Sequence, residues 1–219
     1  MRKYLVKYKD KFGEEKTKIS SDGSTMYLII RGIKFEGEDF DCLEGKIDDD
    51  KFEYIKYADG SGDLTNFRMK IIFPVKISHK TKIKTENVTF EIEVGKTNDI
   101  AKLSPNSIEL DASFGFFNST KKWGVNSMWE MKKMLPKDTR LITCLTCSKS
   151  AYTPGEGKSF GGLICFKKMQ KDFNNASNNH ELINIIGKGW AEDTIINVQE
   201  TFDCYEHQYY IKNNGGYKS

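Results

Sequence analysis

Four cysteines in the C-terminal half are the residues of this chain best suited to chemistry: Cys144, Cys147, Cys165 and Cys204. The first two form a C-x-x-C pair, a spacing that lets two sulfurs reach one metal ion. A structural zinc ion takes four ligands at the corners of a tetrahedron. The pattern therefore predicts one structural zinc ion, provided that the segments carrying Cys165 and Cys204 lie beside the pair. His180 and His207 are alternative ligands.

Two other interpretations of these cysteines stay open. A zinc ribbon has two C-x-x-C pairs and this chain has one, so Cys165 and Cys204 can equally be buried thiols that pack as small hydrophobic side chains. A thiol- or metal-dependent enzyme centred on Cys144 and Cys147 is the alternative with catalysis. A redox site would need a helix directly after the pair to lower the thiol pKa. The residues after Cys147 read Ser-Lys-Ser-Ala-Tyr-Thr-Pro-Gly, which predicts a loop.

Strands must position the cysteines. The patterns predict strands over 140–144, 160–166 and 194–205, which place Cys144, Cys165 and Cys204 in a small C-terminal sheet. A helix is expected over 125–135, because apolar residues recur at helical spacing and Pro136 ends the run. A shorter helix is expected over 180–186.

The N-terminal half reads as an antiparallel meander. Residues 4–8 and 16–20 flank a glycine turn and predict a hairpin, and the next strands follow closely. The further strands are expected over 25–31, 33–35, 52–57, 67–73 (ended by Pro74), 88–94 and 107–112, with a loop over 59–63. The chain is therefore expected to be α+β and mostly antiparallel. An N-terminal β half (1–112) and a C-terminal α+β half (113–219) are expected to pack as one unit.

An acidic segment precedes a basic one. The acidic residues between 36 and 50 are Glu36, Glu38, Asp39, Asp41, Glu44, Asp48, Asp49 and Asp50. From 64 to 85 every charged residue is basic: Arg68, Lys70, Lys76, Lys80, Lys82 and Lys84. The acidic spacing matches no calcium loop. A surface with two signs of charge favours steered contact with another protein, although solvated strand faces would give the same pattern.

Composition excludes several classes of protein. The chain has 219 residues and a formal charge of +3, an excess too small to argue for nucleic acid as a partner, because nucleic-acid binding usually needs a strongly basic face. The start of the sequence lacks the apolar stretch of a signal peptide, and no window is apolar enough to span a membrane. A cytoplasmic protein with reduced thiols is expected.

Several motifs together resemble a known family. The motifs are residues 8–15, 32–41, 143–150 and 199–204, together with Ser21-Asp22-Gly23, Tyr152, Pro154, Gly155, Phe160-Gly161, Cys165 and Gly216-Tyr217. The set is similar to a family of uncharacterised bacterial proteins, some of which are encoded near polymorphic toxins. An aspartate usual in that pattern before Tyr152 is Ala151 here, which weakens a polar role for that loop. The resemblance implies an immunity protein.

These observations favour a non-enzymatic protein that binds another protein. A toxin, whose active site the chain would cover, is the partner that the resemblance suggests. The acidic residues between 36 and 50 are the expected contact, because they would suit a basic nuclease. A metal- or thiol-dependent enzyme at the C-x-x-C pair is the first alternative. A structural subunit of a larger assembly is the second.

Overall fold

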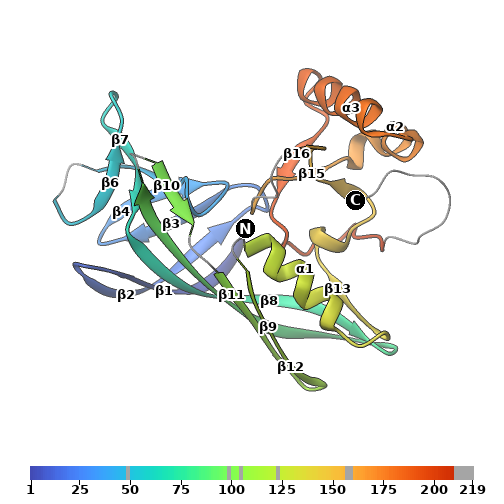
Figure 1. Cartoon of the computed structure of the whole chain (residues 1–219), viewed down its shortest axis with the longest axis horizontal. Coiled ribbons are helices and arrows are strands. Elements are labelled where there is room, and N and C mark those ends of the chain that lie inside the picture. The colour runs from blue at the N-terminus through green and yellow to red at the C-terminus, as the bar shows by residue number, and fades with distance from the viewer. Residues whose placement is uncertain (48–49, 98–99, 104–105, 122–123, 156–159, 210–219) are drawn as a thin grey trace.

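A computed structural model of the chain describes all residues except 48–49, 98–99, 104–105, 122–123, 156–159 and 210–219 (Figure 1). Within the described residues, one large antiparallel sheet contains thirteen strands. They are β1 (Arg2–Asp10), β2 (Gly13–Ser21), β3 (Met26–Ile30), β4 (Ile33–Gly37), β5 (Glu44–Lys46), β6 (Glu53–Lys56), β7 (Ser61–Thr65), β8 (Phe67–His79), β9 (Lys82–Thr97), β10 (Ile100–Leu103), β11 (Asn106–Ala112), β12 (Gly115–Lys121) and β13 (Thr139–Ile142).

A smaller unit follows the large sheet in the sequence. Its elements are β14 (Ser150–Ala151), β15 (Leu163–Cys165), β16 (Ile196–Val198), α2 (Gln170–Asn175) and α3 (Asn179–Ala191). Helix α1 (Gly124–Met134) lies between β12 and β13 in the sequence, so it connects two strands of the large sheet. In Figure 1 the large sheet curls around the left and lower part of the molecule, whereas α2 and α3 occupy the upper right. The expected α+β class, with mostly antiparallel strands and a small cysteine-bearing sheet, is confirmed.

The order of the large sheet follows from its short hairpins. Its main path runs β12-β11-β9-β8-β1-β2-β3-β4-β5-β7-β6, and β10 and β13 pair with β9 and β8. β8 alternates strictly, so that Phe67, Met69 and Ile71 are buried while Arg68 and Lys70 face solvent. This period of two gives the sheet one buried and one wet face. Because β12 and β13 also join it, the sheet continues beyond residue 112, and the division of the chain there stays a prediction.

Pro74 does not end its strand as the sequence pattern predicts. β8 continues to His79, and Pro74 lies opposite Asn87 of β9. On the other side of β8, pairing with β1 stops at Ile72 and pairing with β13 starts at Lys76. Pro74 thus sits in the gap between the two partners, where its missing N–H group breaks no ladder hydrogen bond.

Other element boundaries differ for similar reasons. The loop expected over 59–63 is half strand, because Ser61–Thr65 pairs with both β5 and β6. The long strand expected over 194–205 is short: only Ile196–Val198 pairs, and the chain then turns into irregular backbone. The short strands β5, β10 and β12 and the helix α2 were not expected. α3 extends well beyond 180–186, with Asn178 accepting the Glu181 amide hydrogen bond at its start.

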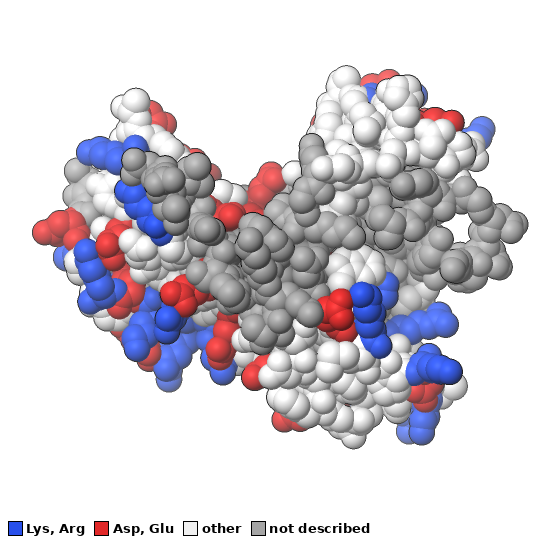
Figure 2. Space-filling view, in the orientation of Figure 1, with Lys and Arg blue, Asp and Glu red and all other residues white. Residues whose placement is uncertain are grey.

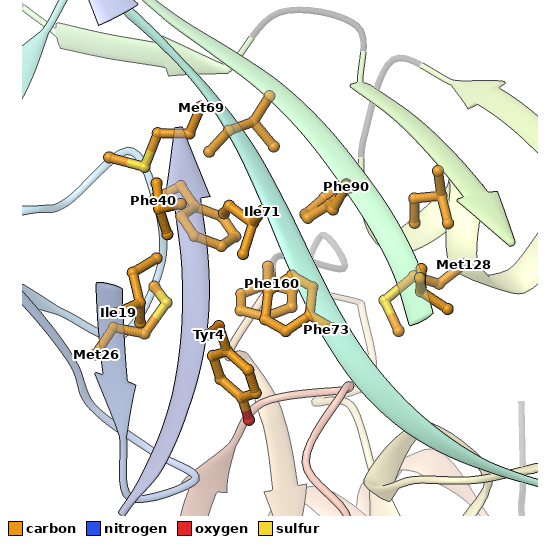
Figure 3. Packing of buried hydrophobic residues seen from close by; sticks show 14 of the residues in the cluster. Tyr4, Ile19, Met26, Phe40, Met69, Ile71, Phe73, Phe90, Met128 and Phe160 are labelled. Carbon is orange, nitrogen blue, oxygen red and sulfur yellow. The ribbon is translucent and has the colours of Figure 1, made fainter. Parts of the chain in front are cut away.

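The main core fills the concave side of the large sheet and includes the C-terminal segment. Figure 3 shows Phe160 among the side chains of the sheet. Its ring stacks on Phe40 at a centroid distance of 4.8 Å and lies 6.1 Å from Phe90 and 6.3 Å from Phe73. A second, smaller cluster lies in the C-terminal unit, where Phe166 and Phe173 stack at 4.2 Å.

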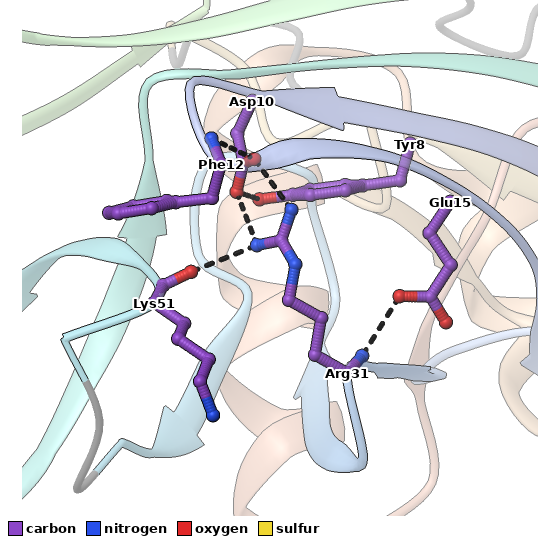
Figure 4. Close-up of polar contacts among 6 residues, drawn as sticks. All are labelled: Tyr8, Asp10, Phe12, Glu15, Arg31 and Lys51. Atoms are coloured by element: carbon purple, nitrogen blue, oxygen red, sulfur yellow. Dashed lines mark hydrogen bonds and ion pairs between the residues drawn. The ribbon is translucent and has the colours of Figure 1, made fainter.

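A buried ion pair fixes the tip of the β3–β4 hairpin. Arg31 contacts both carboxylate oxygens of Asp10, at 2.6 and 2.7 Å (Figure 4). Asp10 also accepts hydrogen bonds from the Tyr8 hydroxyl and the Phe12 amide, each at 2.9 Å. Burial alone would raise the pKa of Asp10, but the hydrogen bonds from Arg31, Tyr8 and Phe12 outweigh it and hold that pKa below its ordinary value.

In the described part of the chain, no helix is long and apolar enough to span a membrane.

Candidate functional site

The four predicted cysteines come together in space. All of them line one pocket of about 370 Å³, which lies between the small sheet and the turn after β13. Cys144 begins a single 3₁₀ turn and Cys147 follows it. Cys165 ends β15, and Cys204 lies in the irregular segment after β16. Residues far apart in the sequence are thus neighbours, as the zinc interpretation requires.

Backbone hydrogen bonds hold the C-x-x-C turn in place. The Cys147 amide donates to the Cys144 carbonyl at 3.1 Å. The Ser150 hydroxyl is within hydrogen-bond distance of the carbonyls of Cys144 and Cys147, at 2.7 and 3.1 Å. The Cys144 amide donates to the carbonyl of Phe202 at 2.8 Å. This last bond ties the turn directly to the segment that carries Cys204.

Amide groups point at two of the sulfurs. The Glu206 amide donates to the sulfur of Cys204 at 3.4 Å, and the Lys167 amide donates to the sulfur of Cys165. In both cases the donor lies two residues after the cysteine. Hydrogen bonds to sulfur favour the thiolate form, which is the form that binds a metal. Burial acts in the opposite direction and raises the pKa of Cys144 and Cys165, and neighbouring thiols add to the rise.

Two lysines flank the thiols. Lys149 is buried, and its nearest carboxylate oxygen, on Glu206, is 3.9 Å away. Lys167 also lines the pocket and contacts Glu206 directly. Both ammonium groups thus lie beside the carboxylate of Glu206, and Asp22 lines the same pocket, so its lining holds two basic and two acidic side chains.

The four cysteines do not form a ready-made metal site. As the side chains are placed, no group of three or more Cys, His, Asp or Glu residues within the described ranges is positioned to hold an ion. Neither alternative ligand lines the pocket. His207 Nε2 lies 3.1 Å from the Thr146 hydroxyl, and His180 is exposed on α3, 3.3 Å from Asn184.

The surroundings of the pair do not favour thiol catalysis. A loop and the short strand β14 follow Cys147, so no helix N-terminus is directed at it. Burial raises the pKa of Cys144, which disfavours the nucleophilic thiolate. The enzyme alternative keeps Cys147 as its best-placed thiol.

A second cluster of polar residues was missed from the sequence. Glu200 is fully buried behind the thiol pocket, where its carboxylate accepts hydrogen bonds from the Tyr152 hydroxyl at 2.6 Å and the Gly161 amide at 2.9 Å. Asp39 is also buried and lies close enough for Glu200 to raise its pKa further, after burial and the charge of Asp41. A glutamate inside a run expected to be strand was the only signal available.

Burial raises the pKa of Glu200 from its ordinary value of 4.5 to about 7. A folded-state pKa above the unfolded value means that the folded protein binds this proton more tightly. Stability is therefore highest below pH 4.5 as far as this group is concerned, and is lost as the pH rises through 7. The loss from this group is expected to be about 3 kcal/mol, because one pH unit corresponds to about 1.4 kcal/mol.

Glu200→Gln tests this linkage, because its side chain cannot ionise, its amide oxygen can accept from the Gly161 amide, and its NH2 group can donate to the Tyr152 hydroxyl oxygen. Urea unfolding measured from pH 5 to 8 should show a smaller fall in the free energy of unfolding for Glu200→Gln than for the unmodified chain. Glu192→Gln, at the exposed end of α3, is the control and should follow the unmodified chain. Identical pH profiles for all three proteins would contradict a titrating Glu200.

The predicted acidic residues fall into four groups. Glu36, Glu38, Glu44 and Asp50 are exposed, Asp41 is half-buried, and Asp48 and Asp49 lie outside the described residues. Asp39 differs from the rest because it is only 8% exposed. As folded here, it cannot lie on the solvated patch expected from the sequence.

Two exposed carboxylates and one half-buried carboxylate form a row across neighbouring strands. Glu36 of β4 lies directly opposite Glu44 of β5, and Glu44 lies opposite Asp63 of β7. Asp63 also accepts a hydrogen bond from the Tyr57 hydroxyl. We call these three residues the carboxylate row. Like charges directly opposite one another on a sheet are destabilising.

Lysines face one another at the other end of the same outer surface. Lys7 of β1 lies opposite Lys16 of β2 and Lys70 of β8, and we call these three the lysine row. Glu14 and Glu91 form ion pairs with Lys7 and Lys70, at 3.0 and 2.8 Å. In Figure 2 the basic side chains gather at the lower left, where Figure 1 draws β1 and β2.

Tyr27 and Ile29, on β3, lie between the strands of the two rows, whereas Leu5 lies on β1, two residues from Lys7. Leu5 and Ile29 are 57% and 58% exposed. Leu5 is paired with Ile72, and Ile29 and Tyr27 line a surface pocket of about 490 Å³ that is edged by lysines. Tyr27 lies opposite Glu36, so the apolar centre borders the carboxylate row.

Comparison with curated proteins and with solved structures found no match to this chain. A scan against family models found one match, to a family of unknown function, DUF6304. The matched residues include the large sheet and the C-x-x-C pair but stop before Cys165 and Cys204. With its residues 2–150 matched, the chain belongs to DUF6304, a family of unknown function.

Proposed function

We propose that this chain is a non-enzymatic protein that binds another protein through the outer face of β1–β5 and β7. The observation that carries the proposal is the arrangement of that face: an exposed apolar centre lies between the lysine row and the carboxylate row. Protein interfaces combine apolar and aromatic anchors with a polar rim. A nucleic acid would instead require one sign of charge across the face.

The finer proposal is an immunity-type role. The carboxylate row would face a basic surface of the partner, such as the active site of a nuclease toxin, and the lysine row would face acidic residues beside it. Within each row like charges oppose one another, and ion pairs with Lys34, Glu14 and Glu91 offset this repulsion in part in the free protein. The rows become favourable when a surface of opposite charge covers them, and they also speed association at low salt.

Replacement of anchors and rim charges tests this proposal. The tagged chain would first be used to capture and identify its partner in the native cell extract. Binding of the purified partner would then be measured for two variants, Ile29→Asp and Glu36→Lys/Glu44→Lys. Each is expected to weaken binding at least about tenfold, because one places a charge in the apolar centre and the other reverses the carboxylate row.

Glu192→Lys is the matched control, since Glu192 is exposed directly after α3 and far from this face in the sequence. It should bind like the unmodified chain. The Glu36→Lys/Glu44→Lys variant should also lose part of the salt dependence of association. If both variants of the face bind as tightly as the control, the partner contacts another surface and the proposal fails.

A further inference from the structure

Thiols that are merely buried have no reason to gather. Four of the five cysteines of the chain line the same pocket, and they arrive from three separate segments. The fifth, Cys42, lies elsewhere, against Asp39. A free cysteine that packs as a small hydrophobic side chain needs only apolar neighbours. The convergence therefore points to a ligand that needs sulfur.

We propose that this pocket holds one zinc ion, bound by the four cysteines that line it: Cys144, Cys147, Cys165 and Cys204. Zinc binds thiolates in a tetrahedron and is the usual ion of structural sites with four cysteines. Binding requires the sulfurs to rotate into the pocket that they share, because no three of the described Cys, His, Asp or Glu side chains are positioned to hold an ion as placed. The proposal is independent of the protein-binding face.

The charges around the pocket suit such a centre. Zinc with four thiolates carries a net charge of −2. Lys149 and Lys167 line the pocket and both contact the carboxylate of Glu206, while Asp22 lies in the same lining. Among the described residues, the ion-pair partner of the buried Lys149 is Glu206, at 3.9 Å, so the cost of burying this ammonium group is only weakly compensated. A centre of negative charge beside it would offset that cost.

The backbone is also arranged as zinc-binding turns require. The Cys165 and Cys204 sulfurs each accept an amide hydrogen bond from two residues ahead. Such outer contacts orient metal ligands and stabilise their charged form. Cys144 and Cys147 are held at the two ends of one tight turn, so their side chains can reach a common ion.

Metal analysis of the purified full-length chain is the direct test. After purification without added metal, about one zinc per chain is expected. Replacement of zinc by cobalt should give the thiolate-to-cobalt charge-transfer absorption of a four-thiolate site. This test uses the unmodified chain, so it does not depend on whether a variant folds. Iron with acid-labile sulfide would overturn the assignment in favour of an iron–sulfur cluster. Metal-free, reduced protein that also fails to take up zinc would overturn it altogether.

Single variants identify the ligands. Cys165→Ser and Cys204→Ser should lose the bound zinc, whereas Cys42→Ser, at the cysteine outside the pocket, should keep it. Cys204→His restores a zinc ligand and should recover binding if the serine variant only fails to fold. Full zinc content in either pocket variant, with the fold intact, would show that its cysteine is not a ligand and would overturn the four-cysteine site.

Discussion

Arg31→Ala is expected to lower the free energy of unfolding by about 3–5 kcal/mol, the cost of leaving a buried charge without its partner. The Asp10 side chain is only 2% exposed, and Arg31 neutralises it through two short contacts. The guanidinium also lies over the rings of Tyr8, Phe12 and Phe52, at 5.1–5.8 Å from their centroids. Removal of Arg31 therefore leaves Asp10 charged inside a group of aromatic rings.

Arg68→Ala is the matched control, because Arg68 forms an ion pair with Glu93 at 2.9 Å on the exposed face of the sheet. Exposed pairs contribute about 0–1 kcal/mol. The double variant Asp10→Asn/Arg31→Ala should recover part of the loss, since it removes the orphaned charge. Urea unfolding followed by circular dichroism measures all three. A loss for Arg31→Ala no larger than that for Arg68→Ala would contradict the central role of this pair.

The part of the fold that could be predicted depends on local pattern. The first hairpin, β3, β4, β8, β9 and α1 follow from alternation or helical spacing within one segment, and the structure contains all of them. β5 and β7 could not be predicted in the same way. Their residues are acidic, glycine-rich or short in pattern, and they are strands only because neighbouring strands pair with them. Pro74 shows the same dependence, because its tolerance is set by which strand lies beside it.

The candidate sites, too, could be predicted only where they depend on a local pattern. The C-x-x-C turn is local and could be predicted, whereas the approach of Cys165 and Cys204 depended on an assumption about neighbouring strands. The assumption holds only for β15, which carries Cys165 and pairs with β16. It is wrong for the other two segments, because β13 pairs with β8 of the large sheet and Cys204 approaches through irregular backbone. The Glu200 cluster and the Arg31–Asp10 pair could not be predicted, because burial of a charged side chain depends on elements that pack over it from elsewhere in the sequence.

The same dependence underlies a second large effect, at Phe160. This residue precedes β15 in the sequence, yet its ring packs among Phe40, Phe73 and Phe90 of the N-terminal part. Phe160→Ala is expected to cost about 3–5 kcal/mol, through lost burial and the cavity left behind. Phe116→Ala, at an exposed ring on β12, is the control and should change stability by about 0.5 kcal/mol or less.

Whether the Phe160→Ala variant unfolds in one transition or in two is more informative than the size of its loss in stability. If both parts of the chain form one cooperative unit, Phe160→Ala should shift a single transition that is seen alike by circular dichroism and by tryptophan fluorescence. Separate transitions would mean that the C-terminal unit unfolds independently. The thiol pocket joins the turn after β13 to the small sheet, and Glu200 is held by Tyr152 and Gly161. Cooperative unfolding would therefore mean that both clusters assemble only with the complete fold, so that loss of the Phe160 ring should also weaken metal retention without touching any sulfur.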